Sequence, residues 1–138
     1  MDPAKVQLVQ QSFGRCLVNQ AHGQSFLDAF YAEFLASDPR IKRLFSSTDL
    51  EKQKDLLKRG LTMLIMYAGG VGLAKAAIEQ LAVKHGRNQL NIDPTLYRLW
   101  LKSLSTCVRK YDRKYDDALG DLWNEVLESG ISAMKQAY

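Results

Sequence analysis

The sequence has few of the residues that mark membrane or secreted proteins. It contains two cysteines and three prolines in 138 residues, and its longest apolar run, residues 61–71, is interrupted by Thr62 and a glycine pair. A membrane-spanning helix needs about 20 apolar residues, which this run does not supply. Residues 1–5 contain no basic region followed by an apolar core, so no export signal is visible. We therefore expect a cytoplasmic protein without a membrane span.

Cysteine spacing and charge exclude further classes of protein. Cys16 and Cys107 lie far apart, each on the apolar side of an expected helix, which favours buried free thiols in a reducing compartment. Their spacing excludes a zinc site and a Cys-x-x-Cys-His haem attachment. The net charge is +4, and the Lys and Arg residues are scattered among acids, so nucleic acid is not an expected partner.

The overall composition is that of one globular domain. Hydrophobic residues make up 46% of the chain and charged residues 25%, without internal repeats or low-complexity segments. A chain of 138 residues is long enough to bury a core of its own. We expect residues 1–138 to form a single domain.

Apolar residues recur at helical spacing along most of the chain, and no segment alternates with the period of two that strands show. All three prolines follow an aspartate, a pair that suits the start of a helix. His22-Gly23 and residues 69–72 mark corners. The pattern predicts an all-α fold of about seven helices, over residues 3–18, 26–35, 39–45, 49–68, a segment ending at 85, 94–111 and 119–134.

The long helix from about Asp49 to Ala68 carries a buried amide in this pattern. Thr48 and Glu51 have the spacing of a capping box at its start. Burying an unpaired amide costs several kcal/mol, so Gln53 implies a polar partner or a wet cavity. The inward stripe of this helix reads Leu50, Gln53, Leu57, Gly60 or Leu61, and Leu64.

His85 is the central residue of the candidate site. It follows Leu81 by four residues and Ile78 by seven, so its imidazole shares the apolar stripe of its helix. Gly86 ends that helix, which places the histidine in the last turn. A histidine on an apolar stripe is either a core residue with satisfied nitrogens or a ligand, and both interpretations stay open on this feature alone.

Four side chains together indicate chemistry at an iron centre: Tyr31, Phe45, Gln53 and His85. A histidine that binds haem iron through one nitrogen leaves the opposite position open if the facing residue is only an amide, as Gln53 is. The Tyr31 hydroxyl and the Gln53 amide are suited to donate hydrogen bonds to a gas in an otherwise apolar pocket. Taken singly, Tyr31 and Phe45 are equally well explained as core aromatics.

The order of these parts resembles that of a globin, most closely the bacterial single-domain haemoglobins and the globin half of flavohaemoglobins. The resemblance covers nearly the whole chain. It is carried by Phe30-Tyr31, Asp38-Pro39-x-Ile-x-x-Leu-Phe45, Gln53 with Leu57, Ala82-Val83-Lys84-His85, and Leu90-Asn91-Ile92-x-Pro94-x-x-Tyr97.

The resemblance implies a globin fold around one non-covalent b-type haem. It implies that His85 is the iron ligand, that Phe45 packs on the haem face, and that Tyr97 orients the ligand histidine. Tyr31, Gln53 and Leu57 would surround the gas, which would be dioxygen, nitric oxide or carbon monoxide. The remaining expected haem contacts are Leu81, Arg87 and Ile92, with Lys84 and Arg87 as either haem-propionate partners or solvated charges.

The chain departs from the flavohaemoglobin pattern in three ways. The segment between Phe45 and Gln53 is shorter, so the choice of Gln53 over Lys52 or Lys54 as the inward residue depends on the helical stripe. Flavohaemoglobins have a glutamate late in the last helix, held to the tyrosine and the ligand histidine, where this chain has Tyr138. Without that carboxylate, electron donation from the imidazole should be weaker. The 138 residues also include no flavin or nicotinamide domain.

Three classes of function remain open at this point. The first is a carrier or scavenger that binds dioxygen and nitric oxide tightly and releases dioxygen slowly. The second is a nitric oxide dioxygenase that depends on an external reductase. The third is a gas-sensing or purely structural globin-like domain.

Overall fold

The computed structural model describes residues 1–138 and is almost entirely helical. The helices are α1 (Pro3–Val18), α2 (Phe26–Ser37), α3 (Pro39–Leu44), α4 (Leu50–Ala68), α5 (Gly72–His85), α6 (Leu96–Tyr111) and α7 (Asp117–Gln136). The two-residue strands β1 (Gln20–Ala21) and β2 (Gln24–Ser25) form the one sheet. The prediction of an all-α fold with about seven helices is confirmed.

The short antiparallel hairpin between α1 and α2 was not predicted from the sequence. Gln20 pairs with Ser25, and Ala21 pairs with Gln24. The turn residues His22 (φ 54°) and Gly23 (φ 77°) both lie in the left-handed region, which a two-residue hairpin turn of type I′ requires. Strands of two residues are too short to show a period of two, so only the corner was visible in the sequence.

Aspartate–proline pairs begin two of the helices as expected, but not the third. The Asp2 and Asp38 side chains accept hydrogen bonds from the first free backbone N–H groups of α1 and α3. Asp93 instead accepts bonds from both the backbone N–H (2.9 Å) and the hydroxyl (2.8 Å) of Thr95. This closes a local turn, so α6 begins two residues later than predicted, at Leu96.

The start of α4 also differs from the prediction of a capping box. Asp49, not Thr48, caps the helix: its carboxylate accepts the backbone N–H groups of Glu51 (3.0 Å) and Lys52 (3.4 Å). The expectation that Leu50 faces inward is wrong as well, since 37% of its surface is exposed. A residue in the first turn precedes the point where α4 reaches its neighbours, so helical spacing alone misplaces it.

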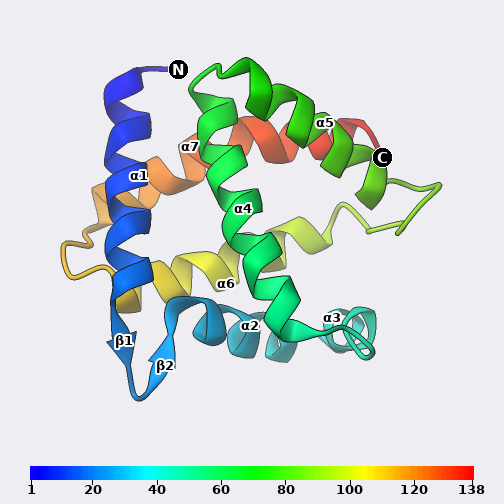
Figure 1. Cartoon of the computed structure of the whole chain (residues 1–138), viewed down its shortest axis with the longest axis horizontal. Coiled ribbons are helices and arrows are strands. Elements are labelled where there is room, and N and C mark those ends of the chain that lie inside the picture. Colours follow the sequence, from blue (N-terminus) through cyan, green and yellow to red (C-terminus); the bar gives the residue numbers. More distant parts are fainter.

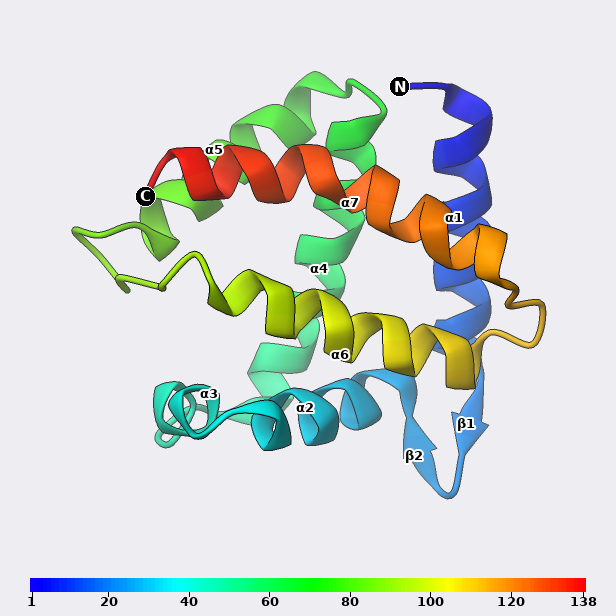
Figure 2. The same ribbon diagram turned by 180° about the vertical axis from the view of Figure 1, so that it is seen from behind.

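The helices form two crossed layers. α6 and α7 run antiparallel on one face, and α1 and α4 cross them on the other (Figures 1 and 2). α2 packs on α6 at one edge, and α5 packs on both α4 and α7 at the opposite edge. The end of α5 and the short helix α3 therefore lie on the same side of the molecule, away from α1 and the hairpin (Figure 1). None of the helices combines the length and the apolar character that crossing a bilayer demands.

One continuous core of 28 buried residues joins the layers. The helix expected over residues 119–134 forms and buries an apolar stripe of Leu119, Trp123, Val126, Leu127, Ile131 and Met134, while Leu122 is half-buried against the core. Gly130 lies where α7 meets α4, and a Cβ at that position would overlap the Leu64 side chain. Both cysteines are buried free thiols, as expected, and burial raises the pKa of Cys16 to about 12 and that of Cys107 to about 11.

A buried polar network ties α1 to α7 and to the turn before it. The Asp112 carboxylate is wholly buried and accepts bonds from Arg15 Nε (2.6 Å), Ser12 Oγ (2.5 Å) and the Lys114 backbone N–H (2.9 Å). Ser12 Oγ in turn accepts the indole N–H of Trp123 (2.9 Å). Burial alone would raise the pKa of Asp112, but these donors outweigh it and lower that pKa. The carboxylate is therefore ionised and fully paired.

Candidate functional site

His85 ends α5 in the position that the sequence predicted. The Gly86 backbone caps the helix and its N–H bonds to the Val83 carbonyl (3.1 Å). Two residues of the same helix, Ile78 and Ala82, are buried, whereas His85 is only half-buried. The imidazole therefore lies at the margin of the core and not within it.

The tautomer of His85 follows from a single hydrogen bond. Its Nδ1 lies 2.8 Å from the backbone carbonyl oxygen of Leu81, one turn earlier. A carbonyl can only accept, so Nδ1 carries the proton and donates it. The proton-free nitrogen is then Nε2, whose lone pair can bind a metal ion. The backbone thus fixes the ring through Nδ1 and leaves Nε2 without a hydrogen-bond partner.

Tyr31 lies inside the molecule with its hydroxyl engaged. Its side chain is 5% exposed, and the hydroxyl donates to the backbone carbonyl of Gln53 (3.2 Å), which joins α2 to α4. Burial raises the pKa of Tyr31 to about 12, so the hydroxyl keeps its proton at neutral pH. The ring of Phe45 packs edge-on against Tyr31 and against Phe34, with centroids 6.0 Å apart in each case. Tyr31 is thus a protonated donor beside an aromatic wall.

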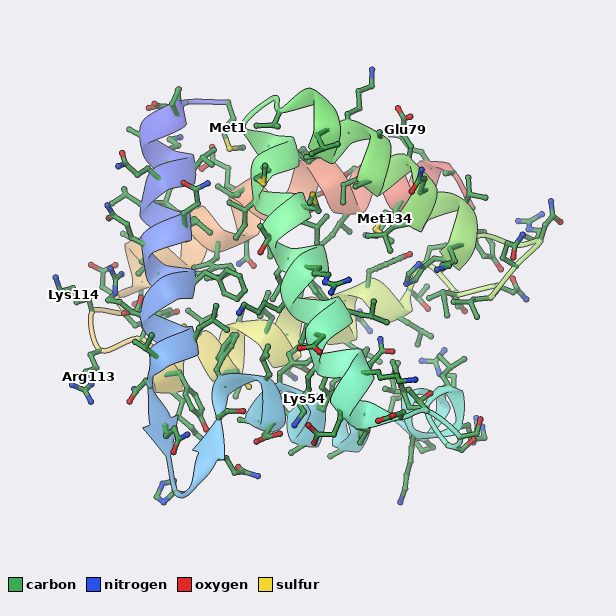
Figure 3. The ribbon with its side chains drawn as sticks, in the orientation of Figure 1. Met1, Lys54, Glu79, Arg113, Lys114 and Met134 are labelled. Atoms are coloured by element: carbon green, nitrogen blue, oxygen red, sulfur yellow. The ribbon has the colours of Figure 1, made fainter.

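Gln53 is half-buried, and its side-chain amide makes no hydrogen bond in the structure. Its neighbours face elsewhere: Lys52 is exposed, and Lys54 pairs with Asp28 (2.6 Å) and Glu51 (2.8 Å) where α4 passes over α2 (Figure 3). Lys54 is half-buried like Gln53, but its ammonium is already paired with these two carboxylates. The Gln53 amide remains free to act as a donor.

The other expected haem contacts lie in different environments. Leu57 is buried on α4, while Leu81, Ile92 and Tyr97 are half-buried and pack against the core. Burial raises the pKa of the Tyr97 hydroxyl. Tyr97 makes no hydrogen bond with His85, whose Nδ1 proton goes to the Leu81 carbonyl instead. In this structure the backbone, and not Tyr97, orients the imidazole.

Two groups of candidate residues emerge. In the first, Tyr31 of α2 contacts both Phe45, at the end of α3, and the backbone of Gln53 on α4. Leu81, His85 and Ile92 form the second group, in which the Ile92 N–H bonds to the His85 carbonyl (2.9 Å). Met134 of α7 is buried beneath α5 (Figure 3). No hydrogen bond connects the two groups directly.

Sequence reasoning missed the contacts of Tyr138. Its hydroxyl donates to the side-chain oxygen of Asn91 (2.5 Å), and its ring lies under the Arg87 guanidinium, 4.8 Å from the ring centroid. Arg87 is otherwise exposed. Tyr138 and Asn91 are 47 residues apart, and no periodicity or motif links positions that distant.

Two cavities elsewhere offer no alternative site. One of about 10 Å³ lies between α6 and α7, with walls that include Leu104, Tyr115 and Trp123, and has room for one water molecule. The other is a surface groove of about 340 Å³, in which Lys54 is paired with Glu51 and, at its edge, with Asp28. Neither includes His85 or Tyr31.

Comparisons with known proteins point to one family. The model of the globin family matches residues 28–134. A solved structure from Pseudomonas aeruginosa, described as structurally highly homologous to a human haemoglobin, is 39% identical in sequence with a TM-score of 0.91, covering 97% of this chain and 98% of the other. The comparison with curated proteins gave no match. The segment matched by the family model contains every candidate residue from Tyr31 to Tyr97.

Proposed function

Because the chain belongs to the globin family, whose members bind haem and small gases, we propose that it reversibly binds dioxygen and nitric oxide at a non-covalent b-type haem. In this proposal His85 is the iron ligand. The observation that carries it is the bond from His85 Nδ1 to the Leu81 carbonyl, because it leaves Nε2 available as the ligating nitrogen.

The candidate residues of this chain fit a bound haem. Bound haem would supply an iron that can bind a diatomic gas. Phe45, Leu57, Leu81, Ile92 and Tyr97 offer apolar or aromatic surface, and four of these five are only half-buried, so they retain surface to cover a planar ligand. A flat apolar ligand held by such surface and one histidine needs no covalent link.

The two cations beside His85 differ in their freedom to meet a haem propionate. Arg87 already stacks on Tyr138, with 4.8 Å between its guanidinium carbon and the ring centroid. Lys84 is exposed and makes no ion pair. We therefore assign Lys84 as the freer propionate partner.

Tyr31 and Gln53 supply the donors on the opposite side. The Tyr31 hydroxyl keeps its proton at neutral pH and now donates to the Gln53 backbone carbonyl, from which it can rotate to a gas that carries partial negative charge. The Gln53 amide has no partner to give up. These donors oppose departure of the gas more than its entry, so we expect tight binding with slow release.

A second function, nitric oxide dioxygenation with an external reductase, uses the same pocket. It would combine nitric oxide and dioxygen to nitrate, with one electron returned by the reductase in each turnover. The Nδ1 proton of His85 goes to a neutral carbonyl and not to a carboxylate, which makes the imidazole less electron-donating. This favours the carrier or scavenger role. Turnover with a reductase, compared with the autoxidation rate, separates the two.

Hemin titration of the purified haem-free protein tests the proposal. The unmodified chain should take up one hemin and develop a Soret band, and carbon monoxide should shift that band in the ferrous form. His85→Ala should abolish the histidine-ligated spectrum. His22→Ala is the matched control, because His22 is the other histidine, lies exposed in the hairpin turn and should leave the spectrum unchanged. A colourless chain, or an unaltered spectrum in His85→Ala, would contradict the proposal.

A further inference from the structure

The loop that follows His85 is held from outside by Tyr138, which lies just beyond α7. The Tyr138 hydroxyl donates to Asn91 Oδ1 (2.5 Å), its backbone oxygen accepts the Arg87 N–H (3.4 Å), and the Arg87 guanidinium lies over its ring. We call these three residues, Arg87, Asn91 and Tyr138, the Tyr138 clasp. It fastens both halves of the loop to the end of α7.

The loop itself curls back onto the last turn of α5. The N–H groups of Leu90, Asn91 and Ile92 donate to the carbonyls of Lys84 (3.0 Å), Gly86 (2.8 Å) and His85 (2.9 Å), respectively. Asn91 adopts a φ of 51°, in the left-handed region that non-glycine residues seldom occupy. The clasp therefore holds the one strained residue of a loop that is bonded to the His85 backbone.

The residues just beyond α7 reach the corner at Gly86 in ordinary van der Waals contact. A Cβ at Gly86 would lie 3.2 Å from the carbonyl oxygens of Ala82 and Val83, and 3.5 Å from the carbonyl oxygen of Ala137. The last residues of the chain thus contact the same turn of α5 that carries the imidazole.

We propose that Tyr138 is a positioning residue for His85: by fixing the loop it holds the imidazole in its ligating position and slows the loss of haem. This inference rests on the proposed function. The Leu81 carbonyl restrains the imidazole from within the helix, and the clasp restrains the backbone that follows. Removing groups that orient a metal ligand typically weakens metal binding by about 10- to 100-fold. Because the clasp acts through the backbone, we expect about 10-fold.

Hemin transfer to an excess of apomyoglobin measures the effect on the intact loaded protein. Tyr138→Phe removes only the hydroxyl and should lose hemin about 10-fold faster than the unmodified chain. The matched control is Tyr115→Phe, because Tyr115 also lies under an arginine, Arg109 at 5.3 Å, but near the opposite end of α7. The control should lose hemin at the unmodified rate.

A spectroscopic signature separates positioning from a general loss of stability. In the ferrous, gas-free protein, the iron–histidine stretching band should shift or broaden in Tyr138→Phe and not in Tyr115→Phe. In the haem-free protein, amide hydrogen exchange at Asn91 and Ile92 should speed up in Tyr138→Phe, while exchange in α1 stays unchanged. A merely structural contribution would lower stability without moving the band.

The outcomes distinguish this inference from the function on which it rests. Unchanged hemin loss and an unchanged band in Tyr138→Phe would overturn the positioning role and leave His85 as the iron ligand. Failure of the unmodified chain to bind hemin would overturn the proposed function, and the positioning role with it.

Discussion

In the proposed pocket, the hydroxyl of Tyr31 is the donor that we expect to control release of the gas. Tyr31→Phe keeps the ring, which packs on Phe45, and removes the donor. A net hydrogen bond is worth roughly 1–1.5 kcal/mol, so dioxygen should leave about 10-fold faster. Stopped-flow displacement of dioxygen by carbon monoxide measures this rate.

The control for this variant is Tyr67→Phe. Tyr67 is a half-buried tyrosine of α4 whose hydroxyl makes no hydrogen bond. The Tyr67→Phe variant should therefore release dioxygen at the rate of the unmodified protein. If Tyr31→Phe also released dioxygen at the unmodified rate, Tyr31 would have no place in the pocket.

Asp112 links stability to pH. The pKa of its carboxyl is lowered in the folded chain, so its contribution is present above the pKa of the unfolded chain, about 4, and is lost as the pH falls through the folded pKa. Asp112→Asn leaves Arg15 unpaired and should lower the free energy of unfolding at pH 7 by about 3 kcal/mol. The difference in the free energy of unfolding between Asp112→Asn and the unmodified chain should shrink towards pH 3.

Urea unfolding followed by circular dichroism between pH 3 and pH 7 measures both effects. Asp121→Asn, at an exposed position on α7 without an ion pair, should behave like the unmodified protein. A constant difference between Asp112→Asn and the unmodified chain across this range would mean that the Asp112 charge is not what stabilises the network.

At the residue scale, the sequence predicted which residues lie at the candidate site better than it predicted what each of them contacts. The placement of His85 and Leu81 one turn apart follows from helical spacing, and the structure adds the bond between them. The partner of Tyr31 is a backbone carbonyl of another helix, which no side-chain pattern records. The contact between Tyr138 and Asn91 depends on where two distant segments meet, and that is fixed only by the whole fold.

At the scale of the helices, two glycines predict opposite effects of the same substitution. Gly14 lies within α1 with no atom within 4 Å of an added Cβ, so Gly14→Ala should stabilise the protein by about 1 kcal/mol through helix propensity. Gly130 faces Leu64, which is buried and has little room to move. There overpacking of about 2 kcal/mol outweighs the gain, and Gly130→Ala should lower stability by about 1 kcal/mol.

Thermal unfolding of the two variants, each compared with the unmodified chain, checks this pair. The midpoint should rise for Gly14→Ala and fall for Gly130→Ala. Two rises would show that Leu64 yields easily and that the α4–α7 contact is looser than it is in the structure.

How well an element could be predicted depended on its length and on how much of one face it buries. α7 repeats its apolar residues along its length against a continuous core, and Leu122 is the one residue of that stripe that is only half-buried. The hairpin has strands of two residues, too short for any pattern. The first turns of α4 and α6 were misplaced because a single aspartate side chain decides the cap there, and several nearby residues could have played that part.

At the scale of the whole molecule, haem should act as part of the fold. A ligand that binds only the folded chain adds about 2.7 kcal/mol to the free energy of unfolding at a free concentration 100 times its Kd. We expect a gain of this size when hemin is present. Urea unfolding with and without hemin measures it, and His85→Ala should gain far less. Equal midpoints with and without hemin in the unmodified chain would contradict a role for haem in stability.

The crossed arrangement of the two layers could not be derived from helix periodicity. Periodicity gives the buried face of each helix but not the neighbour that covers it, and here α4 contacts both α5 and α7 while α2 contacts α6. The family resemblance supplied that topology, and the structural and family matches confirm it. The residues around the haem remain predictions, because the match establishes the family and not the role of each side chain.

The reactivity of the two cysteines reports on unfolding of the chain. Cys16 and Cys107 are buried, and with pKa values of about 12 and about 11 they present almost no thiolate at neutral pH. The thiolate is the form that reacts with oxidants and alkylating reagents. Both sulfurs should therefore resist oxidation by peroxide in the folded chain and be labelled by alkylating reagents only when the chain unfolds.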